Sequence, residues 1–109
     1  MAQKMPLAQR YDFYIEVYEN RRFPPSTIII DDIVLLGDPA WRYTIKRAST
    51  IDAYELERGL DVLSGFNRQC TFEERKALLG AIDRFIYPHN VEERGGMLTK
   101  LGYACTDPI

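Results

Sequence analysis

The spacing of apolar residues along the chain changes near residue 48. Before this point apolar and polar side chains alternate with a period of two, which is typical of strands. After it, apolar residues recur at the spacing of a helix that is buried on one side. These are Ala53, Leu56, Leu60 and Leu63, followed by Leu78, Ile82 and Phe85. The pattern therefore predicts a small sheet followed by helices that cover it.

The clearest predicted strand runs from Tyr11 to Tyr18, a segment rich in β-branched and aromatic residues. One side of this strand would carry Phe13, Ile15 and Val17, and the opposite side would carry Tyr14 and Tyr18. We expect the first side to be buried against the helices, together with Leu56, Leu60, Leu78 and Ile82. A slip of one residue in register would exchange the two sides.

A hairpin is predicted from Ile33–Leu36 and Trp41–Lys46, because the four residues between them, GDPA, are typical of a turn. The segment Ser26–Leu36 has two interpretations. Its β-branched residues favour a strand, whereas the spacing of its isoleucines and Val34 also marks one side of a helix. We expect a strand with a bend or bulge at Asp31-Asp32.

Three helices are predicted in the second half. Ser49 or Thr50 would cap the first, over about Ile51–Leu63. The sequence Thr71-Phe-Glu-Glu74 fits a capping box and would open a helix from Phe72 to about Ile86. Asn90 would open a third helix, which Gly95-Gly96 would weaken or break. The predicted fold class is therefore α+β: about three antiparallel strands packed against two to three C-terminal helices. We expect one domain over residues 1–109, with a flexible tail at 1–9.

Composition and charge exclude several classes of function. A formal net charge of −2 disfavours a general nucleic-acid coat protein. One histidine and two cysteines do not supply a convincing zinc site, and we expect neither metal nor cofactor. No apolar stretch is long enough for a bilayer, and the first residues do not resemble a signal peptide. A disulfide between Cys70 and Cys105 would be possible only in an exported protein. The sequence predicts a cytoplasmic protein, without a membrane partner, in which both cysteines are free thiols.

Binding to another protein is the function we expect, as an adaptor, inhibitor or regulator of the kind found among phage and mobile-element accessory proteins. The chain has a surplus of tyrosine and arginine, residue types that are enriched at protein interfaces. The candidate contact residues are Tyr14 and Tyr18 with Arg21 and Arg22 in the following turn. A homodimer is an open alternative. The remaining candidate contact residues are Arg42 and Lys46, the basic residues of the third predicted strand.

Two alternative functions stay open. Arg42 and Lys46 would share one face of the third strand and, with Arg21 and Arg22, could contact the phosphates of a nucleic acid. A small enzyme would need His89, the single histidine, beside a thiol or a carboxylate. Phosphate-loop, dinucleotide-binding, serine-elbow and zinc-protease motifs are absent from the sequence. An enzyme is therefore less expected than a binding protein.

Overall fold

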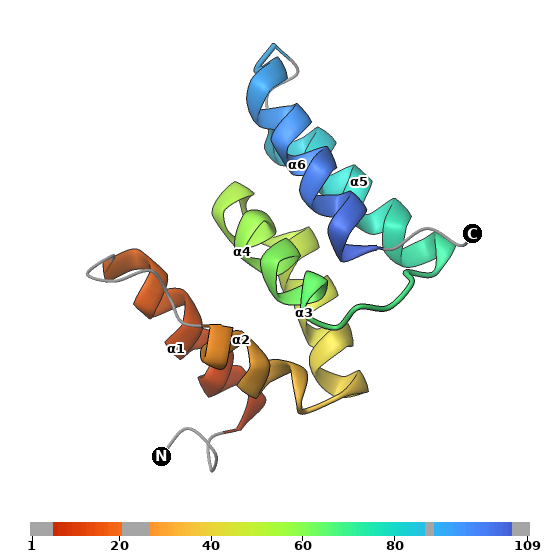
Figure 1. The fold of residues 1–109 in the computed structure, drawn as a ribbon. Helices are drawn as coiled ribbons and strands as arrows, with labels where there is room; N and C mark the ends of the chain where they lie inside the picture. Colours follow the sequence, from red (N-terminus) through yellow and green to blue (C-terminus); the bar gives the residue numbers. More distant parts are fainter. Residues whose placement is uncertain (1–5, 21–26, 87–88, 106–109) are drawn as a thin grey trace.

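The computed structural model describes residues 6–20, 27–86 and 89–105, and within these residues every helix or strand assigned is an α-helix. The helices are α1 (Leu7–Asn20), α2 (Thr27–Val34), α3 (Asp38–Thr50), α4 (Ala53–Ser64), α5 (Phe72–Phe85) and α6 (Val91–Ala104) (Figure 1). The predicted α+β class, with its three-stranded sheet, is therefore wrong. The predicted N-terminal tail is also too long, because α1 begins at Leu7.

Helix α1 replaces the first predicted strand because the segment also carries a helical pattern. Tyr11, Tyr14 and Ile15 are buried, and their spacing of three and four residues places them on one side of a helix. Phe13, which the strand pattern assigned to the core, is 42% exposed. The period of two was real in the sequence, but the buried side of the element follows the period of 3.6.

The predicted hairpin is instead a pair of helices joined by a tight connection. Residues Thr27–Val34 form α2, which buries Ile33, so the expected strand with a bend or bulge at Asp31-Asp32 is wrong and the helical interpretation is confirmed there. Gly37 has a φ of 76°, a left-handed conformation that glycine adopts at little cost, and it turns the chain into α3. Pro39 lies in the first turn of α3, where a missing N–H costs no helical hydrogen bond.

The three predicted C-terminal helices are present, with differences at their ends. Asp52 caps α4, accepting a hydrogen bond from the Glu55 amide, so the prediction of Ser49 or Thr50 as the cap is wrong. The capping box at the start of α5 is confirmed, as is the Asn90 cap of α6. Helix α6 runs through Gly95 and Gly96 without a break.

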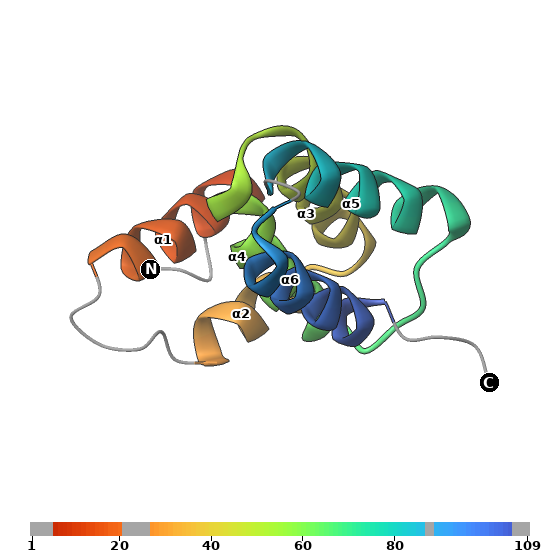
Figure 2. The ribbon, with the colours of Figure 1, turned by 90° about the horizontal axis from the view of Figure 1, so that it is seen from above.

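The helices are arranged as three neighbouring pairs (Figures 1 and 2). The central pair, α3 and α4, packs against α1 and α2 on one side and against α5 and α6 on the other. The larger apolar cluster lies between the central pair and α5–α6, and it includes Leu56, Leu60, Leu78 and Ile82 as predicted. A second cluster lies between the central pair and α1–α2. Ile15 belongs to this second cluster and is not packed with those four residues.

Candidate functional site

Of the predicted contact residues of the first segment, the structure describes the Tyr14 side chain. Tyr14 is completely buried, and its hydroxyl donates a hydrogen bond of 2.9 Å to the backbone carbonyl of Arg58. It therefore joins α1 to α4 and serves the fold. The Tyr18 side chain, together with Arg21 and Arg22, lies outside the described residues.

The two basic residues of the third predicted strand lie on α3. Arg42 and Lys46 are exposed and four positions apart, so they share one side of the helix. Neither has an ion-pair partner among the residues the structure describes. Trp41 and Thr44 are buried on the other side of α3. Trp41 therefore offers no exposed ring beside Arg42 and Lys46 on which a nucleic-acid base could stack.

The groups considered for catalysis are dispersed. Cys70 and Cys105 are joined in a disulfide, so neither sulfur is a thiol nucleophile for His89. His89 lies in an exposed turn before α6. Within residues 6–20, 27–86 and 89–105, no group of three or more His, Cys, Asp or Glu side chains could hold a metal ion.

A partly buried polar centre joins α1, α3 and α4 around Arg47. The guanidinium lies 2.7 Å from Asp12 Oδ1 and 2.8 Å from Glu55 Oε1, and it donates to the Tyr43 hydroxyl at 3.1 Å. It also lies over the Tyr11 ring, 4.6 Å from its centroid. Asp12 and Tyr11 belong to α1 and Glu55 to α4, so the Arg47 side chain of α3 joins the three helices.

The Arg47 centre changes the acid–base properties of its members. Burial opposes the charged form of Arg47, but the hydrogen bonds to Asp12, Glu55 and Tyr43 outweigh this effect and raise the pKa of its guanidinium. Burial, reinforced by the charge of Glu55, raises the pKa of the Tyr11 phenol. Both groups therefore hold their protons more firmly than free side chains do.

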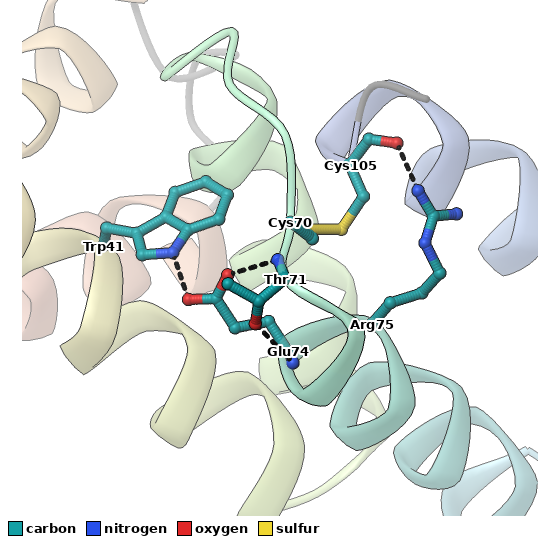
Figure 3. The surroundings of a disulfide bond; sticks show 6 residues. All are labelled: Trp41, Cys70, Thr71, Glu74, Arg75 and Cys105. Carbon is teal, nitrogen blue, oxygen red and sulfur yellow. Dashed lines mark hydrogen bonds between the residues drawn. A yellow bond between two sulfur atoms is a disulfide. The ribbon is translucent and has the colours of Figure 1, made fainter. Parts of the chain in front are cut away.

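A second junction links α3, α5 and the loop before α5 (Figure 3). The Trp41 indole N–H donates to Glu74 Oε2 at 2.5 Å, while Glu74 Oε1 accepts from the Thr71 amide at 2.8 Å. The Arg68 guanidinium covers the Trp41 ring at 4.4 Å from the centroid and pairs with Asp38 at 2.7 Å. Glu74 thus serves both the capping box and the buried indole.

The disulfide lies beside this junction and ties the loop before α5 to the end of α6. The Cα atoms of Cys70 and Cys105 are 4.9 Å apart, within the usual range for a disulfide. The Cys105 carbonyl also accepts a hydrogen bond from Arg75 at 3.2 Å. The expectation of two free thiols is therefore wrong.

The outer side of the α5–α6 pair carries exposed apolar side chains. Phe72 is 76% exposed and Val91 is 75% exposed, and Leu79 and Leu98 are exposed between them. We call these four residues the hairpin face. The sequence did not mark them as exposed. Phe72 and Val91 are the first residues of predicted helices and directly follow the capping residues. Leu79 is adjacent to the buried Leu78.

Contacts between α5 and α6 show that these leucines lie on the same side. Arg75 of α5 bonds to Cys105 at the end of α6, and Asp83 of α5 pairs with Arg94 of α6. Leu79 lies four residues from both Arg75 and Asp83, so it shares their strip of α5. Leu98 lies four residues from Arg94 and shares its strip of α6. The two leucines therefore border the line along which the helices meet.

Comparisons of the chain with protein-family models, with curated proteins and with solved structures found no match in any of the three. None of the described helices is both long and apolar enough to cross a membrane. The interpretation of the chain therefore depends on its own geometry.

Proposed function

We propose that this chain is a non-enzymatic module that docks on another protein through the hairpin face. The observation that carries the proposal is the row of exposed apolar side chains along one side of α5 and α6. A helix of fourteen residues is about 21 Å long, so Val91 and Phe72, at the N-terminal ends of two helices that run in opposite directions, define a strip of that length. Exposed apolar patches on soluble proteins commonly mark contacts with partners.

The charges around this face favour a protein partner over a nucleic acid. Glu92 and Glu93 are exposed in the first turn of α6, where they would repel phosphates. Lys76 and Asp83, of opposite sign, are exposed on the same side of α5. A mixed polar rim around apolar residues is the usual composition of a protein interface.

The test is a photo-crosslinking amino acid placed at Leu98 in the native host, with the captured protein identified by mass spectrometry and then purified. Binding of that protein is measured for the wild type and for a Leu79→Asp, Leu98→Asp double variant. Leu35→Asp is the matched control, because Leu35 is 81% exposed and lies beyond α2, away from the hairpin face. We expect the double variant to lose at least about tenfold in affinity, since two buried charges replace two apolar contacts.

Circular dichroism and a thermal melt establish that the double variant is folded. Full binding by a folded double variant would exclude the hairpin face. Loss of binding in an Arg42→Glu, Lys46→Glu variant, with a steep dependence on salt, would instead support the nucleic-acid alternative. A concentration-dependent dimer that only the leucine substitutions abolish would make a second copy of the chain the occupant.

A further inference from the structure

A cavity of about 410 Å³ opens between the C-terminal ends of α4 and α6. Its volume lies within the range of small-molecule sites, roughly 300–1,000 Å³. The buried Leu60 supplies apolar lining, and the polar lining includes Asp61 and Asn67. Asn67 has a φ of 51°, and this left-handed turn carries the chain past the mouth of the cavity. The cavity lies apart from the hairpin face, because none of the four hairpin residues lines it.

Asp61 and Lys100 line the cavity, and each also pairs with a charged residue outside the lining, Arg58 and Glu57 respectively. Lys100 Nζ lies 3.1 Å from Asp61 Oδ1 and 3.7 Å from Glu57 Oε2. The Arg58 guanidinium lies 2.5 Å from Glu57 Oε1 and 3.6 Å from Asp61 Oδ2. Two carboxylates and two cations cancel, so side-chain charge alone does not select the sign of a ligand.

Two other features make the cavity attractive to positive charge. Helices α4 and α6 run in the same direction and both end at the cavity (Figure 1). The C-terminus of a helix behaves as roughly half a negative charge. Tyr103, which is 71% exposed, also lines the cavity and offers an aromatic ring, whose face attracts cations.

We propose that this cavity binds the guanidinium or ammonium group of an organic cation. Asp61 is the counter-ion, and its Oδ2 atom is the better placed acceptor because its contact with Arg58 is longer than a hydrogen bond. The Tyr103 ring packs against the cation. Lys100 competes with the ligand for Asp61. The proposal does not depend on the docking function of the hairpin face.

The first experiment is a titration of the oxidised chain, followed by NMR and calorimetry at low salt. The probes are N-acetyl-arginine amide, which represents a protein side chain, and choline, which represents a free small cation. N-acetyl-citrulline amide is the matched neutral probe. We expect saturable binding of at least one cation, shift changes at Asn67 and Tyr103, and no saturable binding of the citrulline probe. The tighter cation identifies the source of the ligand.

The proposal predicts that some substitutions weaken cation binding and that another strengthens it. Asp61→Asn should weaken cation binding by about tenfold, because a charge-assisted hydrogen bond becomes a neutral one. Tyr103→Leu should also weaken it. Lys100→Gln should strengthen it several-fold, because the competing ammonium is removed and the cavity becomes net negative. Phe13→Leu, at an exposed aromatic residue of α1 outside both the cavity and the hairpin face, is the control and should leave the affinity unchanged.

Two results would each overturn the proposal. One is the absence of saturable binding by both cations, and the other is equal binding of the arginine and citrulline probes. The first result, combined with binding of inorganic phosphate that Lys100→Gln weakens and Asp61→Asn strengthens, would assign the cavity to an anion.

Discussion

Opening the disulfide should cost this chain a large part of its stability. Cys70 and Cys105 are 35 positions apart, so the bond closes a loop of that length in the unfolded chain. In the chain-entropy description, a loop of this size contributes about 4 kcal/mol to the free energy of unfolding. A domain of this size should lose roughly 4 °C in Tm per kcal/mol, which gives a decrease near 15 °C.

The assay is urea unfolding of the oxidised chain, the same chain with a dithiol reductant, and a Cys70→Ala, Cys105→Ala double variant. Each single Cys→Ala variant should lose about as much as the double variant, because either change opens the same loop. Titration of free thiols in denaturant should give none for the oxidised chain and two after reduction.

A reduced chain as stable as the oxidised one would refute the reasoning. So would two reactive thiols in a folded, oxidised preparation. If Cys105→Ala and the double variant lose stability but Cys70→Ala does not, the loss comes from packing around the buried Cys105, since either single change opens the loop.

Two further predictions concern the packing of α1, α3 and α4. Gly59→Ala should lower the free energy of unfolding by about 1–3 kcal/mol in urea, because the added Cβ would lie 2.5 Å from Ala48 Cβ. Gly96 lies in open space, so Gly96→Ala should leave that free energy unchanged or raise it by up to about 1 kcal/mol. Equal stabilities of the two variants would contradict this packing. The raised pKa of the Tyr11 phenol means that the folded state holds a proton which the unfolded state releases near pH 10, so stability should fall as pH rises above about 10. Tyr11→Phe should reduce this decrease in stability at alkaline pH. An unchanged slope of stability against pH would show that Tyr11 ionises as freely in the folded state as in the unfolded state.

The helices of the second half could be predicted because local signals and apolar spacing agree there. The side chains of Thr71 and Glu74 satisfy each other's backbone amides, and this reciprocal pair is visible in the sequence. Leu56, Leu60, Leu78 and Ile82 then lie on the buried sides of their helices. The continuity of α6 through Gly95 and Gly96 was not predictable from propensity. Its packing through Met97 and Leu101 outweighs the cost of two glycines.

The first half was predicted wrongly because its residues fit two periods. Aromatic and β-branched residues favour strands on average, but tertiary packing decides the outcome. In α3, the buried residues Trp41, Thr44 and Ala48 follow a helical spacing that alternation with Arg42 and Lys46 concealed. An N-terminal proline and aspartate, at Pro39 and Asp38, were interpreted as a turn although they also suit the start of a helix.

The cavity and the hairpin face were beyond sequence reasoning for a different reason. Both depend on side chains that are distant in the sequence and that only the packing of α6 brings together. Asp61 and Lys100 are 39 positions apart, as the hydrogen bond between them records. Nothing local marks either residue as a neighbour of the other.

The division of the apolar interior into two clusters has a consequence for hydrogen exchange. The α1–α2 pair contributes only to the smaller cluster, and the disulfide lies wholly on the side of the larger one. Backbone amides of α1 and α2 should therefore exchange through a partial opening that leaves α3–α6 protected. Reducing the disulfide should accelerate exchange in α5 and α6 and leave the α1–α2 opening almost unchanged. The chain would then behave as two cooperative units, and α3 and α4 would contribute to both of them.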